Sequence, residues 1–132
     1  MYMLDTNICI YVINERDDAL RVRFEAHSAE ICISSITYAE LCYGIANSVR
    51  VAENTRELEA FCLDLEILPF GVDAAAHYGE IRHALRQSGQ PIGANDLFIA
   101  AHARSLNATL VTNDQGEFGR VPELRVENWS QS

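Results

Sequence analysis

Lysine is absent from the 132 residues of the chain, and arginine supplies all ten basic side chains. This absence excludes every reaction that depends on a lysine amine, although arginine can still bind phosphate through two parallel hydrogen bonds. Acidic residues number 19, so the formal net charge is -9. Such a charge argues against a broad basic surface for nucleic acid, because non-specific phosphate binding needs clustered lysine and arginine. It leaves room for an acidic pocket that collects hard cations through carboxylate oxygens.

Long apolar runs are also missing. No stretch approaches the ~20 apolar residues that a membrane-spanning helix needs, and no basic-then-apolar leader opens the chain. Internal repeats, linkers and low-complexity segments are equally absent. The length fits one domain, which would bury roughly two thirds of its unfolded surface. We therefore expect a single soluble domain over residues 1–132 that stays in the cytoplasm.

Cysteine and histidine are present, but without the spacing of a metal site. The cysteines lie among apolar residues and never as a close pair, which is typical of small buried side chains rather than of a zinc site or a disulfide framework. They are Cys9, Cys32, Cys42 and Cys62. His77 and His83 are six residues apart and so do not share a helix face. We expect these two, with His27 and His102, to be surface or half-buried residues.

Short apolar segments alternate with longer segments of helical periodicity along the chain. Buried strands are predicted at residues 2–4, 30–35 and 108–111, and further strands at 67–68 and 124–126. Helices are predicted after residues 5–7 and at 17–28, 36–46, 49–66, 74–85 and 96–103, with a break near 53–55 as an alternative. Asp73 is predicted to cap the helix that follows it, and Trp129 to close the chain against an apolar edge. The alternation indicates a three-layer α/β/α sandwich with a mostly parallel central sheet.

Asp5 directly follows the first predicted strand, and two interpretations of it are open. In open α/β sheets the functional groups lie just beyond the carboxyl ends of the strands, where Asp5 stands. Alternatively, Asp5 or Thr6 caps the helix that begins there. Glu40 has the same ambiguity, because it could close a capping box with Thr37 or point toward Asp5.

Two further carboxylates occupy comparable positions. Asp96 opens a nearly all-apolar helix, where the helix dipole favours a negative charge. The approach to it over residues 89–95 contains glycine and proline and is more elaborate than a cap requires. Asp114 follows the predicted strand at 108–111, and Glu117 lies within reach of it.

The four carboxylates form a joint pattern that local capping does not explain. Two carboxylates ~4 Å apart repel by about 4 kcal/mol at an effective dielectric constant near 20, so four in one pocket need a cation. Magnesium or manganese is the natural counter-charge for oxygen ligands. Such a site can activate water and stabilise a phosphoryl transition state, as in two-metal nucleases. The pattern therefore predicts metal-dependent phosphodiester hydrolysis at Asp5, Glu40, Asp96 and Asp114.

Four motifs follow one another at a characteristic spacing. They are Met3-Leu4-Asp5-Thr6-Asn7, Ser34-Ser35-Ile36-Thr37-Tyr38-Ala39-Glu40-Leu41 with Gly44, Gly89 through Ala103 including Ile92-Gly93-Ala94-Asn95-Asp96, and Val111-Thr112-Asn113-Asp114. In this order the chain resembles PIN-domain ribonucleases over essentially its whole length, and among them the VapC toxins of bacterial toxin-antitoxin pairs. The resemblance implies a PIN-like fold.

The resemblance also implies roles for individual residues. Asp5, Glu40 and Asp96 would be the metal-binding and catalytic acids, and Asp114 the fourth, a duty that Glu117 could share. The polar groups that place metal, water or phosphate would be Thr6, Ser34 or Ser35, and Thr112. The cofactor would be Mg²⁺ or Mn²⁺.

The implied activity is that of an endoribonuclease toxin that blocks translation. Its leading substrate is initiator tRNA, cut in the anticodon stem-loop. The implied partners are a cognate VapB-type antitoxin and a second toxin copy, in a homodimer and a higher toxin-antitoxin complex. With so negative a chain, the RNA must be held by a small number of arginines. Arg16, Arg82 and Arg86 are candidates because of their positions beside the site segments. The alternative for these arginines is pairing with Glu80 on the helix surface.

Other classes of protein gather acids at strand ends as well. Phospho-accepting receiver domains and haloacid-dehalogenase-type phosphatases do so, but both hold the phosphoryl group with a lysine, which this chain lacks. A PIN-like scaffold that binds RNA or protein without cutting remains the alternative function.

Overall fold

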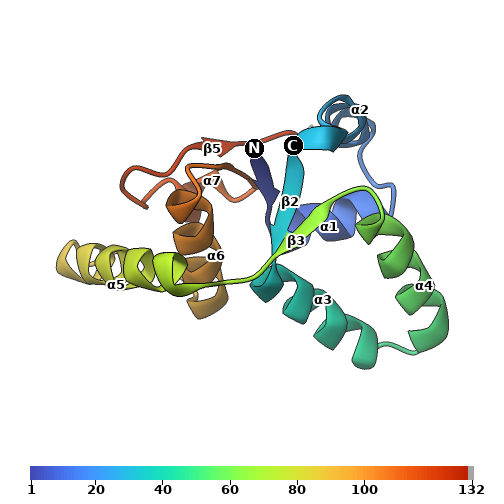
Figure 1. Cartoon of the computed structure of the whole chain (residues 1–132), viewed down its shortest axis with the longest axis horizontal. Coiled ribbons are helices and arrows are strands. Elements are labelled where there is room, and N and C mark those ends of the chain that lie inside the picture. Colours follow the sequence, from blue (N-terminus) through green and yellow to red (C-terminus); the bar gives the residue numbers. More distant parts are fainter. Residues whose placement is uncertain (131–132) are drawn as a thin grey trace.

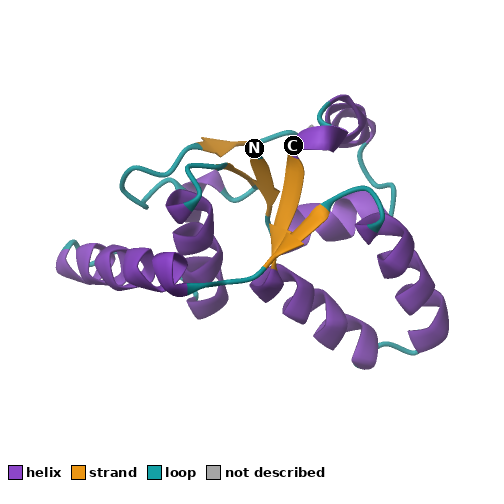
Figure 2. Cartoon of the chain, in the orientation of Figure 1, coloured by secondary structure: helices purple, strands orange, loops and turns teal. Residues whose placement is uncertain are grey.

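Five short strands form one sheet at the centre of the computed structural model, which describes residues 1–130 (Figures 1 and 2). All pairings between them are parallel, in the order β3-β2-β1-β4-β5. The strands are β1 (Tyr2–Leu4), β2 (Ile31–Ser34), β3 (Glu66–Leu68), β4 (Thr109–Val111) and β5 (Val126–Glu127). Each predicted strand is therefore present, and the last begins two residues later than predicted.

Helices connect the strands and cover both faces of the sheet, which gives the predicted three-layer α/β/α sandwich (Figure 1). They are α1 (Thr6–Ile13), α2 (Asp18–Ala26), α3 (Ser35–Ala46), α4 (Val51–Cys62), α5 (Val72–Gln87), α6 (Ala94–Ser105) and α7 (Gln115–Phe118). A single turn of 3-10 helix, Ser28–Glu30, precedes β2.

The structure excludes one alternative and contradicts one prediction about the helices. The region of 49–66 contains one continuous helix, α4, with no break at 53–55. Asp73 does not cap α5, because the helix already begins at Val72 and its N-cap residue is Gly71, which offers no side chain. Asp73 instead lies in the first turn, where a negative charge interacts favourably with the helix dipole.

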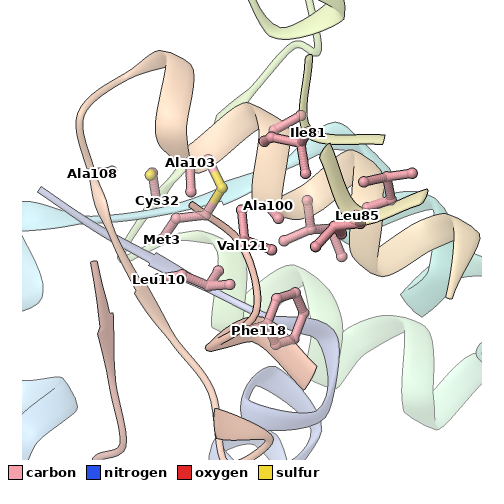
Figure 3. Close-up of a cluster of buried hydrophobic side chains, with 13 residues drawn as sticks. Met3, Cys32, Ile81, Leu85, Ala100, Ala103, Ala108, Leu110, Phe118 and Val121 are labelled. Carbon is pink, nitrogen blue, oxygen red and sulfur yellow. The ribbon is translucent and has the colours of Figure 1, made fainter. Parts of the chain in front are cut away.

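Strand side chains alternate between the two faces of the sheet, so each face has its own hydrophobic core. Met3, Cys32 and Leu110 lie on one face, packed against residues of α5 and α6 (Figure 3). Their neighbours Leu4 and Val111 lie on the other, with residues of α1 to α4. The central strands β1, β2 and β4 are buried on both faces, which explains why the sequence shows continuous apolar runs there rather than alternation.

The cysteine prediction holds for two positions and fails at one. Cys9 and Cys32 are fully buried and Cys62 is half-buried, but Cys42 is exposed on α3. All four thiols are free. Trp129 closes the chain as expected, because it is 2% exposed and packs on the rings of Tyr2 and His27.

None of the helices in residues 1–130 is long and apolar enough to cross a lipid bilayer.

Burial in the α5 and α6 core predicts a large stability difference between two leucines. Leu110 is fully buried, whereas Leu106, just after α6, is 41% exposed. Leu110→Ala should lower the free energy of unfolding by about 2–5 kcal/mol, because it leaves a cavity in the core. Leu106→Ala is the matched control and should change it by less than about 1 kcal/mol. Chemical denaturation measures both, and equal losses would contradict the core assignment.

Candidate active site

The parallel sheet brings the carboxyl ends of its three central strands to one edge. Asp5 follows β1, Ser34 ends β2, and Thr112 follows β4. The backbone N–H of Asp5 donates to the carbonyl of Val111 at 3.0 Å, so the ends of β1 and β4 are held side by side. The residue types that were separate in sequence thereby share one edge.

Asp5 has both roles that the sequence left open. Its Oδ1 accepts a hydrogen bond from the backbone N–H of Ile8 at 2.9 Å, which caps α1. The side chain is also 4% exposed and hydrogen-bonded to Thr112. Burial raises its pKa from 3.8 to about 6, and the charges of Asp114 and Glu40 add to that rise. Asp5 is therefore a helix cap inside a crowded acidic site.

Glu40 is not part of a capping box. The N-cap of α3 is Ser34, whose Oγ accepts from the N–H of Ile36 at 3.1 Å. Glu40 Oε1 instead accepts from Thr6 Oγ1 at 2.5 Å, and its Oε2 accepts from Asn95 Nδ2 at 2.9 Å. These bonds join α3 to the starts of α1 and α6, so the carboxylate points toward Asp5 and Asp96 rather than back along its own helix.

Asp96 lies in the first turn of α6, half-buried and hydrogen-bonded to Glu117. Burial, this bond and the Glu117 charge raise its pKa from 3.8 to about 7, with smaller contributions from Asp5 and Glu40. Gly93, the N-cap residue, donates its backbone N–H to Glu117 Oε1 at 2.9 Å. The glycine-containing approach thus supplies a backbone donor to the acidic cluster, in addition to starting the helix.

Both candidates for the fourth acid belong to the same group. Asp114 caps α7 by accepting from the N–H of Glu117 at 3.0 Å, and its own N–H donates to Thr112 Oγ1 at 2.9 Å. Asp114 is close enough to Asp5 to raise its pKa, whereas Glu117 bonds Asp96. The structure thus connects Asp114 to one central aspartate and Glu117 to the other.

Within the described part of the chain, no positive side chain neutralises these five carboxyl groups. Every ion pair within residues 1–130 involves other acids. In this arrangement no three His, Cys, Asp or Glu side chains of the described residues form a ready metal-ligand set. The carboxyl groups are held instead by Thr6, Asn95, Gly93 and one another. Their oxygens are the donors that Mg²⁺ and Mn²⁺ prefer.

Ser34 and Ser35 differ in their contacts. Ser34 is fully buried, and His102 Nδ1 lies 2.8 Å from its Oγ. Ser35 Oγ instead accepts from the N–H of Phe70 at 3.0 Å, which ties α3 to the segment after β3. Of the two, Ser34 is the one on the strand end beside Asp5.

His102 is the residue that sequence reasoning missed. It was predicted to be surface or half-buried, but it is 3% exposed, and burial lowers its pKa. Because Ser34 Oγ already accepts from Ile36, its hydroxyl hydrogen can go to His102, so the neutral ring links α6 to the end of β2. A signal was present, since His102 is the lone polar side chain within the apolar stretch 97–103.

The three candidate arginines lie in two places. Arg16 follows α1 and stacks over the Tyr11 ring at 5.5 Å, with the whole helix, roughly 12 Å long, between it and the Asp5 end. Arg82 and Arg86 on α5 line a cleft that also includes Ala94 at the start of α6. The alternative pairing with Glu80 is wrong, because Glu80 bonds Arg104 at 2.5 Å.

Comparison with known proteins finds the same fold and closely related sequences. The PIN domain family matches residues 2–124. The chain is 47% identical to ribonuclease VapC2 of Rickettsia felis, covering 99% of both chains, and 42% identical to the tRNA(fMet)-specific endonuclease VapC of Salmonella typhimurium, covering 97% of both. Among solved structures, VapBC2 of Rickettsia felis bound to promoter DNA superposes with a TM-score of 0.92 at 46% identity, covering 98% of both chains.

The double role of Asp5 predicts different behaviour for two substitutions. Asp5→Asn keeps the cap oxygen and removes the charge, so in EDTA it should melt at or above the parent temperature. Asp5→Ala also loses the cap and should be less stable than Asp5→Asn by about 0.5–2 kcal/mol. Both should lose most of the stabilisation that manganese gives the parent. Thermal unfolding with and without manganese measures this, and an Asn variant that melts lower yet keeps its manganese effect would mean that Asp5 is a cap alone.

The raised pKa of Asp96 predicts a pH-dependent stability. Its pKa of about 7 exceeds the 3.8 of an unfolded aspartate, so this contribution is complete below pH 3.8 and is lost as pH rises through 7. Asp96→Asn removes the titration. In EDTA the variant should therefore melt near the parent at about pH 4 and increasingly above it toward about pH 8.

His102 has the opposite effect, because its lowered pKa makes stability fall as pH drops below 6.5. His102 is present in both the parent and Asp96→Asn, so its contribution cancels from the difference between their melting temperatures. A melting-temperature difference that stays constant across the pH range would contradict the raised pKa of Asp96.

Proposed function

Because the chain belongs to the VapC branch of the PIN-domain family, we propose that it is a metal-dependent endoribonuclease, the toxin of a toxin-antitoxin pair. The observation that carries the proposal is the gathering of five carboxyl groups at one sheet edge, with no positive side chain of residues 1–130 paired to them. A structural role for these acids would leave their repulsion uncompensated. A cation bound for nucleic-acid hydrolysis would offset that repulsion.

Some residues of the site would bind the cation, and others orient the residues that bind it. Asp5, Glu40, Asp96 and Asp114 would hold Mg²⁺ or Mn²⁺ through their oxygens, with Glu117 sharing the fourth position. A cation bound there supplies the activation of water and the stabilisation of the phosphoryl transition state. Thr112 orients Asp5, and Thr6 orients Glu40 by donating its hydroxyl hydrogen. Ser34, backed by His102, keeps a polar hydroxyl beside them.

The substrate that we propose is a structured RNA, and the leading one is initiator tRNA cut in the anticodon stem-loop. This assignment follows the relatives named tRNA(fMet)-specific endonucleases in Salmonella typhimurium and Shigella flexneri. A chain of net charge -9 must hold RNA through few contacts, so its affinity should depend only shallowly on salt. A cytoplasmic location suits this substrate.

A cognate VapB-type antitoxin is the proposed partner, since similar solved structures are VapBC complexes. The chain offers a mainly apolar cleft of about 250 Å³ between α1, α3 and α4. Glu40 stands in its wall, so a partner segment in this cleft could carry an arginine or lysine to the carboxylates in place of the cation. The proposed assembly contains a toxin homodimer within a larger toxin-antitoxin complex.

The decisive experiment incubates the purified chain with total RNA in magnesium, manganese or EDTA and maps new RNA ends. We expect cleavage only with metal, leaving 5′-phosphates. Glu40→Gln should reduce the cleavage rate at least about 100-fold, because it removes a charge from the site and keeps the side-chain shape. Glu25→Gln, the same change on the exposed surface of α2, is the control.

Two results would overturn the proposal. Cleavage that persists in EDTA, or ends that carry a cyclic phosphate, would show a protein-only mechanism. RNA that binds but is never cut with any metal would instead support a PIN-like binding scaffold, although the relatives' names do not favour that alternative.

A further inference from the structure

A second cleft, of about 400 Å³, lies beside the start of α6. Helix α5 and the loop before α6 supply most of its lining, which consists of Tyr78, Arg82, Leu85, Arg86, Pro91, Ile92, Ala94 and Leu97. The two residues between the last pair, Asn95 and Asp96, belong to the acidic site. The cleft therefore begins within one helical turn, roughly 5 Å of rise, of a candidate catalytic carboxylate.

An aromatic ring and a guanidinium group, those of Tyr78 and Arg82, line the cleft side by side. The rings of Tyr78 and Phe98 stack with centroids 4.5 Å apart and 16° between their planes. The Arg82 guanidinium lies 5.9 Å from the Tyr78 ring centroid, and its Nη1 donates to the tyrosine hydroxyl at 3.0 Å. Arg82 is exposed and has no carboxylate partner among residues 1–130. Its guanidinium plane is therefore available for stacking with a planar ligand group.

We propose that this cleft holds one unpaired nucleotide of the RNA substrate, with its base stacked on Tyr78 and Arg82 and its phosphate bound by Arg86. The inference rests on the ribonuclease function proposed above and adds to it a subsite that positions the neighbouring phosphodiester bond at Asp96. Tyr78 is a positioning residue in this scheme, because it would touch the base and none of the reacting atoms.

Three properties of the cleft favour a nucleotide. Its volume falls within the range of ~300–1,000 Å³ that small ligands occupy. Bases in single-stranded RNA stack on aromatic rings and on guanidinium planes, and both are present. Phosphate next to five carboxyl groups needs a nearby cation, and Arg82 and Arg86 are guanidinium groups without a carboxylate partner in the described residues.

The test measures binding of fluorescent RNA by anisotropy in EDTA, with one abasic nucleotide placed in turn at every position of its unpaired segment. For the parent, one abasic position should weaken binding about 5- to 100-fold, the effect of losing one stacked base. Tyr78→Leu should weaken binding of intact RNA by a similar factor and show no further loss at that position. Tyr78→Phe keeps the ring and should behave as the parent.

Charge variants test the phosphate contact separately. Arg86→Gln should weaken binding and lower the slope of log affinity against log salt by about 0.7. Arg82→Gln, which removes a stacking plane, should weaken binding of intact RNA and show a smaller further loss at the sensitive abasic position. Arg23→Gln removes the same charge from the exposed surface of α2 and should have none of these effects. Because Arg82 and Arg86 are exposed, these variants test the subsite even if Tyr78→Leu melts early.

The outcomes separate this inference from the proposed function. If the parent cleaves RNA with metal and Tyr78→Leu binds the abasic series and cleaves as the parent does, the subsite is wrong and the ribonuclease stands. If Tyr78→Leu alters only the sedimentation of the free chain, a second copy occupies the cleft, and the inference also falls. If the parent cuts no RNA but the abasic pattern depends on Tyr78, the binding subsite stands and the ribonuclease fails.

Discussion

Repulsion among carboxyl groups at the carboxyl edge of the parallel sheet is the constraint on which the rest of the site depends. Burial places Asp5 where its charge is costly, and Asp114, Glu40 and Asp96 add to that cost. The fold offsets it with neutral donors, namely the hydroxyls of Thr6 and Thr112, the Asn95 amide and backbone N–H groups. None of these removes the net negative charge of the site, and a bound cation would lower that repulsion.

Much of this arrangement could be predicted from the sequence because it follows from local rules. Apolar segments too short for helices become strands, helices between them force parallel pairing, and parallel strands end at one edge. Asp5 and Asp114 directly follow strands, so their meeting at that edge requires no knowledge of side-chain contacts. Asp96 was predictable for a related reason, since it opens a helix too apolar to lie anywhere except in the core.

The failures at Glu40, His102 and Glu80 have a common physical origin, which is the pairing of residues far apart in the chain. Thr37 and Glu40 have the spacing of a capping box, yet Ser34 caps the helix. Glu40 instead accepts hydrogen bonds from Thr6, 34 positions earlier in the sequence, and from Asn95, 55 positions later. His102 is hydrogen-bonded to Ser34, which lies 68 positions earlier in the sequence. Glu80 forms an ion pair with Arg104 of α6 rather than with an arginine on its own helix. Periodicity specifies which face a residue occupies, but not which residue from another element meets it there.

The question whether Asp5 is a cap or an acid shows why local and functional explanations need not compete. Capping uses one carboxylate oxygen, Oδ1, and holds the side chain in a single orientation. Asp114 is held in the same way by the N–H of Glu117. A carboxylate that caps a helix therefore arrives at the sheet edge already ordered, with lone pairs left for a cation, and its ordering entropy is offset by the helix that it stabilises. Capping would thus preorganise the acids for a cation, and a local signal for a cap is no evidence against a role in the site.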